Sequence, residues 1–240
     1  MNPVLLIPAR MASARLPNKP LADIAGIPMI VRVWRQAMAA GLGPVVVAAG
    51  EPEIVAAVEA AGGRAVLTDP DLPSGSDRIW AALGQIETRH DVIVNLQGDL
   101  PALDPAQLRA VVAALDKSGA DIATLAAPID NDADKTNPAV VKAVVAWDAS
   151  GALGRALYFT RATAPTGAGA LFHHVGLYAY RREALESFVA LPPSPLELRE
   201  KLEQLRALEA GMTIAVAKVN EAPLSVDTPD DLERARKLLS

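Results

Sequence analysis

The chain has 240 residues, 51% of them hydrophobic, which is enough to bury a sizeable core. Its formal net charge of −5 argues against a general nucleic-acid binder, because such a protein needs a basic face to neutralise phosphates. The sequence contains no cysteine, which excludes disulfides, thiolate catalysis and cysteine-bound metal ions.

The apolar segments of the sequence are short. None approaches the roughly 20 residues that a membrane helix requires. The apolar run at the N-terminus meets Arg10 and is too short for a signal peptide. We therefore expect a soluble, cytoplasmic protein with no nucleic-acid partner and no membrane association.

In the first half of the chain, short β-branched segments alternate with longer helical patterns, which is typical of βα units around a parallel sheet. The predicted strands are hydrophobic almost throughout, as expected for burial on both faces. They are Val4–Ile7, Val45–Ala48, Ala65–Leu67 and Val92–Leu96. The predicted helices are Met29–Ala40, Glu53–Ala61, Asp77–Thr88 and Pro105–Leu115.

After about residue 120, strand-like segments follow one another with few helices between them. The predicted strands are Asp121–Ala126, Val140–Trp147, Leu153–Phe159, Phe172–Tyr180 and Met212–Val219. Helices are predicted at Arg181–Val189, Pro195–Ala210 and Pro229–Leu239. We therefore expect one α/β domain over residues 1–240: a mixed, mainly parallel sheet flanked by helices, with a small antiparallel insertion at about residues 130–180.

The loop after the first predicted strand carries three cations, Arg10, Arg15 and Lys19. Ligands of open α/β sheets bind at the carboxyl ends of the strands, where cations and free backbone N–H groups can hold a triphosphate. A solvated basic loop is the alternative. The sequence has neither the glycine pattern of a P-loop nor that of a dinucleotide-binding Rossmann site.

Asp99 lies three residues after the end of the strand predicted at Val92–Leu96, and Gly98 before it permits a sharp change in the backbone direction. A carboxylate there can hold Mg²⁺ against phosphate oxygens, since Mg²⁺ prefers hard oxygen ligands and needs few protein groups. A turn or cap residue is the alternative for Asp99, and a helix cap before Pro229 is the alternative for Asp227.

Two further segments carry polar candidates. Ser74 and Gly75 allow close backbone approach and Arg78 adds a cation, although Ser74 can also simply cap a helix. His173 and His174 are adjacent on a predicted strand and point to opposite faces, so only one of them can serve a given site. A buried histidine bonded within the protein is the alternative for His174.

Motifs that span nearly the whole chain resemble those of the 3-deoxy-manno-octulosonate (Kdo) cytidylyltransferases, also called CMP-Kdo synthetases. They occur in the family's order: IPARMASARLPNKPLADIAGIPMI, PSGSDR, VIVNLQGD, NPAVVK, ALYFTRATAP, HHVGLYAY, SPLELREKLEQLRALEAG and SVDTPDDLER. The resemblance implies a nucleotide-diphospho-sugar transferase-like fold and a homodimer built by the antiparallel insertion. It implies Mg²⁺-dependent transfer of CMP from CTP to the acidic 3-deoxy sugar Kdo for lipopolysaccharide synthesis.

The resemblance also implies roles for individual residues. The implied catalytic residues are Arg10, Lys19 and Asp99, and the implied metal ligands are Asp99 and Asp227. The implied nucleotide-binding residues are Pro8, Ala9, Arg10, Arg15, Lys19, Ser74, Gly75 and Arg78. The implied sugar-binding residues are Gln97, Arg161, His174, Tyr178, Glu203 and Gln204, with Tyr178 on the same face as His174.

The sequence departs from the family pattern at four places, one of which is a clearly shorter loop between Arg161 and His174. Leu100 stands where the family has Glu, which removes an acidic group from the expected edge of the sugar pocket. Ala48–Glu51 replaces an Ala-Thr-Asp motif. Asn18 replaces a usual Gly, a mild change because Asn tolerates left-handed backbone angles. The alternatives are therefore an enzyme for another sugar acid (8-amino-Kdo or sialic-acid-like) and a non-catalytic nucleotide-binding relative.

Overall fold

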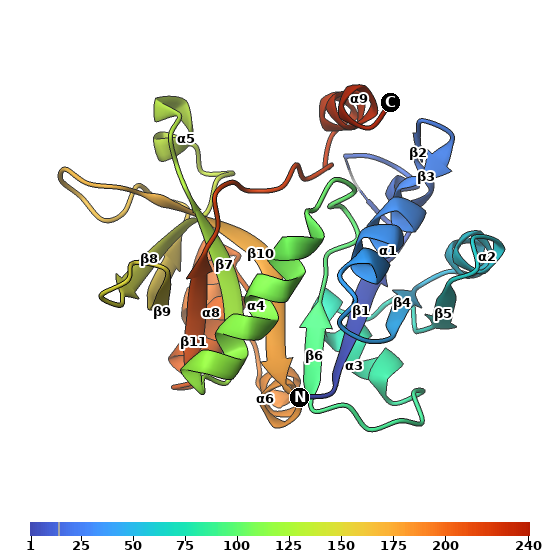
Figure 1. Ribbon diagram of the computed structural model, residues 1–240, viewed down its shortest axis with the longest axis horizontal. Coiled ribbons are helices and arrows are strands. Elements are labelled where there is room, and N and C mark those ends of the chain that lie inside the picture. The colour runs from blue at the N-terminus through green and yellow to red at the C-terminus, as the bar shows by residue number, and fades with distance from the viewer. Residues whose placement is uncertain (14) are drawn as a thin grey trace. The chain divides into compact units, whose positions relative to one another are not determined.

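The computed structural model describes residues 1–13 and 15–240 (Figure 1). The chain divides into two compact units, one of Met1–Arg109 with Pro223–Ser240 and the other of Ala110–Ala222. That a single domain spans the chain stays a prediction. Among the described residues, no helix combines the length and the apolar character that crossing a bilayer demands.

The first unit contains parallel strands in the order β5-β4-β1-β6. They are β1 (Pro3–Ala9), β4 (Val45–Ala49), β5 (Arg64–Leu67) and β6 (Val92–Asn95). All five residues of β4 and all four of β6 are buried, as expected for strands covered on both faces. Because these strands are parallel, their carboxyl ends lie at one edge of the sheet, which is where the site is built.

The helices predicted for this unit are confirmed within a few residues. They are α1 (Met29–Ala39), α2 (Pro52–Ala60), α3 (Gly75–Leu83) and α9 (Pro229–Leu238), and α4 (Pro105–Ser118) begins in this unit and ends in the other. The sequence analysis did not predict the short 3₁₀ helix η1 (Lys19–Leu21) or the antiparallel pair β2 (Asp23–Ile24) and β3 (Ile27–Pro28).

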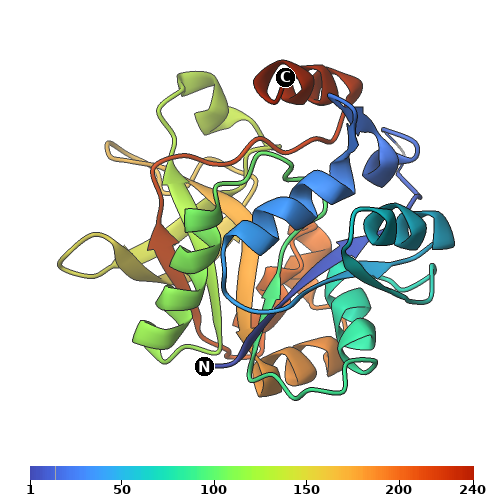
Figure 2. The same ribbon diagram turned by 45° about the vertical axis from the view of Figure 1, so that its right-hand side comes forward.

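The C-terminal helix α9 packs beside β2 and β3, as Figures 1 and 2 both show. A small apolar cluster holds it there, formed by Ile24, Met29, Val226, Leu232 and Ala235. This packing fixes the segment before α9 against the N-terminal part of the unit.

The start of α9 is a capping box between Thr228 and Asp231. Thr228 Oγ1 accepts the N–H of Asp231 at 3.2 Å, and Asp231 Oδ2 accepts the N–H groups of Thr228 at 2.9 Å and Asp227 at 3.1 Å. Burial raises the pKa of Asp231, but these bonds and the ion pair with Arg234 outweigh it and lower the pKa to about 2.

We expect Asp231→Asn to lower the free energy of unfolding by about 2 kcal/mol at pH 7, since the carboxyl pKa falls from about 4 in the unfolded chain to about 2. A depressed pKa stabilises the fold above pH 4, and this contribution is lost as pH falls toward 2. The deficit relative to the original protein should therefore shrink from pH 4 to pH 2 in urea unfolding curves. Exposed Asp230→Asn is the control, with a smaller, helix-dipole-sized loss. A deficit independent of pH would contradict the argument.

The second unit contains strands in the order β10-β7-β11-β9-β8, and β8 also pairs with β10 at Lys142 and His173. They are β7 (Ile122–Pro128), β8 (Lys142–Trp147), β9 (Leu153–Thr160), β10 (Phe172–Arg181) and β11 (Ile214–Lys218). Only the β7–β11 pair among them is parallel. The strands predicted for this unit are confirmed, and the short helix α5 (Asp132–Thr136) was not predicted.

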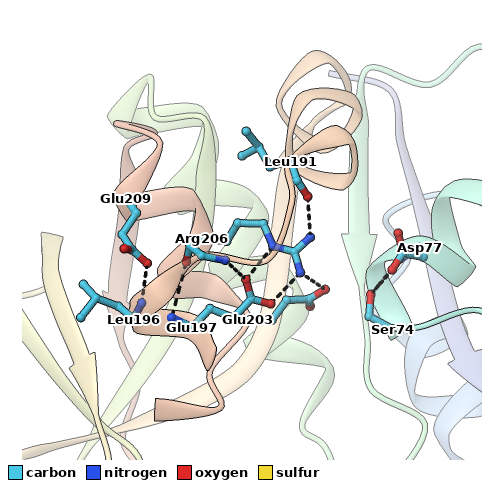
Figure 3. Close-up of polar contacts among 9 residues, drawn as sticks. Ser74, Asp77, Leu191, Leu196, Glu197, Glu203, Arg206 and Glu209 are labelled. Atoms are coloured by element: carbon cyan, nitrogen blue, oxygen red, sulfur yellow. Dashed lines mark hydrogen bonds and ion pairs between the residues drawn. The ribbon is translucent and has the colours of Figure 1, made fainter. Parts of the chain in front are cut away.

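The helix predicted at Pro195–Ala210 is wrong as a single element. After α6 (Arg182–Ala190), the structure has two short helices, α7 (Pro195–Glu200) and α8 (Gln204–Glu209). Lys201 ends α7 with a left-handed backbone at φ 55°. Arg206 NH2 then bonds Glu197 Oε1 at 2.6 Å and ties α8 to α7 (Figure 3). Three residues that follow the break are buried, and their burial stabilises it: Leu202, Gln204 and Leu205.

Candidate functional site

A cavity of about 430 Å³ lies in the first unit, at the carboxyl ends of β1 and β6. Every residue predicted from the sequence for nucleotide binding lines it, together with Gln97 and Asp99. The remaining lining residues are Ala12, Ser13, Pro20, Leu72 and Gly98. The cations, the small residues and one predicted metal ligand therefore share one cavity.

Close backbone packing explains the glycines of this cavity. A Cβ on Gly98 would lie 3.0 Å from the backbone oxygen of Pro8, tighter than ordinary van der Waals contact. A Cβ on Gly75 would lie 3.3 Å from Pro8 Cγ. The first strand and the two segments that face it therefore approach one another only because these positions lack a side chain.

Ser74 has both of the roles considered from the sequence. Its Oγ accepts the N–H of Asp77 at 3.1 Å and donates to Asp77 Oδ2 at 2.7 Å, so it caps α3 (Figure 3). Ser74 and Gly75 also line the cavity. The N-terminal end of α3 therefore borders it, where free N–H groups favour an anion.

Arg78 borders the cavity but is almost fully buried, with 2% of its surface exposed. Its guanidinium donates to Thr68 Oγ1 at 2.7 Å, to the carbonyl of Asp69 at 2.9 Å and to that of Pro70 at 3.0 Å. Burial lowers the pKa of Arg78, and the charge of Arg10 adds to this while Glu51 and Asp69 oppose it. Arg78 thus holds the segment before Leu72 in the cavity wall.

Glu51 is a residue of this region that the sequence analysis missed as functional. Its Oε2 accepts the N–H of Met11 at 2.9 Å, which fixes the cationic loop. Glu51 is the N-cap residue of α2 yet makes no side-chain cap bond. The sequence does show a carboxylate just before a helix. A carboxylate at that position usually accepts N–H groups of the helix that follows, so it gives no indication of a bond to a distant loop.

The centre of the site is an ion-pair cluster around Lys19. Its Nζ lies 2.8 Å from Asp99 Oδ2 and 3.0 Å from Asp227 Oδ1, and Arg15 NH2 lies 3.3 Å from the same Asp227 oxygen. Burial lowers the pKa of Lys19, but the two carboxylates outweigh it and raise the pKa above its ordinary value. Lys19 begins η1 directly after Asn18, whose φ of 57° is a left-handed backbone of the kind that Asn tolerates.

The capping alternative for Asp227 is wrong, because Thr228 is the N-cap of α9. The Asp227 carboxylate is left to face Lys19 and Arg15. A hydrogen bond of 2.9 Å from the N–H of Val226 to the carbonyl of Asp99 brings the two acidic segments together. Two residues 128 positions apart in sequence thus present oxygens to one cationic atom.

The pair of carboxylates fits a magnesium ion. Within residues 1–13 and 15–240 no cluster of three or more histidine or acidic side chains is found. Two oxygens suffice for Mg²⁺, which keeps water and phosphate oxygens as its other ligands. Asp99 and Asp227 can each supply one such oxygen.

Leu100, which was expected at the edge of the sugar pocket, is a buried residue outside the lining of this cavity. Its side chain is 6% exposed, and it is not among the described residues that line the cavity. Its carbonyl accepts the N–H of Leu103 at 3.2 Å, so the residue belongs to the core and to the turn after Asp99. The apolar residue is explained by burial.

The predicted sugar-binding residues fall in both units. Gln97 lines the cavity of the first unit and donates to Asn95 Oδ1 at 3.1 Å. The other five residues lie in the second unit. Two of these, Tyr178 and Gln204, each lie against the imidazole ring of a third, His174.

His174 is buried and bonded at both ring nitrogens. This agrees with the alternative interpretation of the sequence, a buried histidine bonded within the protein. The hydroxyl group of Thr124 has one proton to donate. Two carbonyl oxygens can accept it, that of Val175 at 3.0 Å and that of Leu177 at 2.9 Å from Thr124 Oγ1. His174 Nε2, 3.0 Å from Thr124 Oγ1, must then be the donor. Gln204 Nε2 faces Nδ1 at 3.4 Å. The imidazole is therefore neutral with its proton on Nε2.

Tyr178 lies on the same face as His174, as predicted, with ring centroids 5.5 Å apart. The strand register shifts between Val175 and Tyr178, and the two side chains keep one face because the shift inserts an even number of residues. Burial raises the pKa of the Tyr178 phenol well above its ordinary value, and the charges of Tyr180 and Glu203 add to this.

The Arg161 guanidinium, predicted to bind the sugar acid, donates to backbone carbonyls. Its Nε donates to Glu200 at 2.8 Å, NH1 to Pro138 at 3.0 Å and NH2 to Lys201 at 3.3 Å. Glu203, next to Gln204, has its Oε1 at 4.0 Å from Arg206 NH2. Arg161 therefore ties the end of α7 to the segment before β8.

We expect one of the three histidines to stay neutral far below pH 6, since burial and the charge of His173 lower the pKa of His174 to about 3. Long-range ¹H–¹⁵N spectra should show one ring with its proton on Nε2 from pH 7.5 to pH 5, and His174→Asn should remove that signal. Because the unfolded chain takes up this proton below about pH 6.5, His174 also lowers stability as pH falls toward 3. Three rings that all titrate near pH 6.5 would show the assignment to be wrong.

Comparison with known proteins identifies the family. A model described as cytidylyltransferase matches residues 4–214. The 3-deoxy-manno-octulosonate cytidylyltransferase of Parvibaculum lavamentivorans is 66% identical, covering 100% of this chain and 93% of that protein. The protein of that name from Rhodospirillum centenum is 64% identical, covering 99% of this chain and 93% of the relative.

Solved structures agree with this. One described as CMP:2-keto-3-deoxy-manno-octonic acid synthetase complexed with CTP is 38% identical with a TM-score of 0.92, covering 100% of this chain and 98% of that one. A nucleotidyl transferase from Methanothermobacter, 16% identical with a TM-score of 0.64 over 99% and 97% of the two chains, shares the fold. The predicted mixed α/β fold with a helix-flanked sheet is therefore confirmed.

The fold and the family match together define a nucleotidyltransferase. The chain belongs to the family of the 3-deoxy-manno-octulosonate cytidylyltransferases.

Proposed function

We propose that this protein transfers CMP from CTP to the anomeric hydroxyl of Kdo and releases pyrophosphate, as a cytoplasmic step of lipopolysaccharide synthesis. The cavity carries the proposal, because three cations of one loop and the carboxylate of Asp99 line it together. Full-length similarity to relatives named for this reaction supports Kdo over another sugar acid and over a non-catalytic role.

The cationic loop acts on the phosphates. Arg10, Arg15 and Lys19 neutralise the triphosphate and the departing pyrophosphate, and the N-terminal end of α3 adds free N–H groups. The small residues Ser74 and Gly75 leave room for close backbone approach to the base and the ribose. The hydroxyl oxygen gives up its proton to solvent and bonds to the α-phosphorus, while the bond from that phosphorus to the bridging oxygen breaks and pyrophosphate leaves. Positioning and charge neutralisation supply the catalysis.

Asp99 and Asp227 are the residues proposed to hold Mg²⁺. Their oxygens lie within 3.0 Å of the same atom, Lys19 Nζ, so they are near enough to share one ion. When bound, Mg²⁺ neutralises phosphate charge and lowers the repulsion that the incoming hydroxyl meets.

Gln97, Arg161, His174, Tyr178, Glu203 and Gln204 are proposed for the sugar acid. Because His174 is neutral and bonded on both nitrogens, its role is to orient Tyr178 and Gln204, which both contact its ring. The remaining N–H groups of Arg161 suit the sugar carboxylate.

The first test of this function is its substrate requirement. We expect the purified protein to release pyrophosphate from CTP only when Kdo and Mg²⁺ are both present, because the loop binds phosphates but supplies no acceptor. Coupled pyrophosphate release with each of the four ribonucleoside triphosphates and a panel of sugar acids measures this. CTP binding without turnover for every 2-keto-3-deoxy acid would refute the catalytic proposal.

The second test concerns the carboxylates. Asp99→Asn and Asp227→Asn should each lower kcat/KM by about 100- to 1,000-fold, as expected when one charged group at the reacting phosphates is removed. Their thermal unfolding should stay close to that of the original protein. Asp104→Asn, an exposed position outside the cavity lining, is the matched control. Near-normal rates in both variants at saturating Mg²⁺ would exclude this pair of ligands.

We further propose a homodimer built by the strand-rich insertion. Leu157 on β9 is 50% exposed, and an exposed apolar strand residue favours cover by a partner. Light scattering at micromolar concentration should give twice 25.1 kDa, and Leu157→Lys should shift the population toward the monomer. Met38→Lys, equally exposed on α1, should not. A mass of one chain for the original protein at all these concentrations would rule out the dimer.

A further inference from the structure

Lys19 lies between the two carboxylates that the proposed function assigns to the metal. Its ammonium is 2.8 Å from Asp99 and 3.0 Å from Asp227, and the Arg15 guanidinium adds a contact of 3.3 Å to Asp227. The side chains of Lys19 and Asp99 are only 17% and 22% exposed, so water screens their attraction little. Both carboxylates thus have a cationic partner without any metal.

A metal ion on the same oxygens would meet this ammonium. Oxygen ligands hold Mg²⁺ at about 2.1 Å, so an ion bonded to Asp99 Oδ2 lies no more than about 5 Å from Lys19 Nζ. Two cations this close in a half-buried site repel each other strongly. Lys19 and the metal therefore compete for the carboxylates for as long as Lys19 has no other anion to bind.

A triphosphate in the cavity would supply that other anion. Lys19 lines the cavity next to Arg10 and Arg15, and its long stem can carry the ammonium from one partner to another. The backbone at Lys19 is held by the 3.1 Å bond from the N–H of Ala22 to the Lys19 carbonyl. The ammonium can therefore change partners while the backbone at Lys19 keeps its conformation.

We infer that Lys19 determines when the metal binds: it keeps divalent ions off Asp99 and Asp227 in the nucleotide-free protein and releases both carboxylates when a triphosphate takes over its ammonium. This inference rests on the proposed function, since it assumes that the two carboxylates are the metal ligands. Its consequence is that metal and nucleotide enter the site together.

The experiment is a titration of the full chain with Mn²⁺ alone, in which free Mn²⁺ is measured by electron paramagnetic resonance. Lys19→Met, which keeps the bulk of the stem and removes the charge, should bind Mn²⁺ about tenfold or more tightly than the original protein, as expected when a unit charge at this distance is removed. Adding Asp99→Asn to this variant should abolish the gain, because it removes a ligand.

Arg10→Met is the matched control. It removes the same charge from the same cavity, and among the described residues no bond joins Arg10 to Asp99 or Asp227. We expect little change in its Mn²⁺ affinity. An equal gain in Arg10→Met would mean that overall cavity charge, and not competition by Lys19, sets the affinity, and would overturn the inference.

A second measurement guards against a poorly folded variant. Mg²⁺ should raise the melting temperature of Lys19→Gln more than that of the original protein, because a ligand that binds the folded state stabilises it in proportion to its affinity. Unchanged Mn²⁺ affinity in Lys19→Met together with equal Mg²⁺ stabilisation would overturn the inference. If the original protein still turns over CTP and Kdo in that case, the proposed function stands. Absence of turnover together with the predicted gain in Mn²⁺ affinity would refute the function alone.

Discussion

The site depends on one charge contact, the ammonium of Lys19 shared between Asp99 and Asp227. It joins the loop after β1, the turn after β6 and the segment before α9, which are far apart in the sequence. A backbone hydrogen bond and apolar packing bring these charged side chains together. The Val226–Asp99 backbone bond sets the two acidic segments side by side, and the apolar cluster under α9 keeps them there.

The polar groups at the cavity of the first unit are charged, whereas those around His174 in the second unit are neutral. In the first unit, charged groups meet at a cavity, where a triphosphate can replace one partner by another. In the second unit, His174, Thr124 and Gln204 form a neutral network in which the proton positions are fixed by what each atom can donate or accept. All three side chains are buried, so each polar atom needs a partner within the protein, and the network supplies one.

Local sequence patterns predicted most helices and strands, because the formation of these elements depends largely on residues that are close together in the chain. The strands of the first unit are continuous apolar runs, and the backbone of Asn18 follows from the residue type. The break between α7 and α8 was missed because a helical pattern continues through it. Lys201 turns left-handed only because the burial of Leu202 and the Glu197–Arg206 ion pair require it.

The sequence by itself determined the fold class and the cationic loop, since these depend on residue type and strand order, and its resemblance to a known family implied which residues gather at the cavity. Only the tertiary structure decided what those residues bond to. Lys19 between two carboxylates, Arg161 on three carbonyls, Leu100 in the core and a neutral His174 are all set by partners distant in sequence. Their spacing along the chain carries no information about these contacts, because packing of the strands and helices brings the partners together.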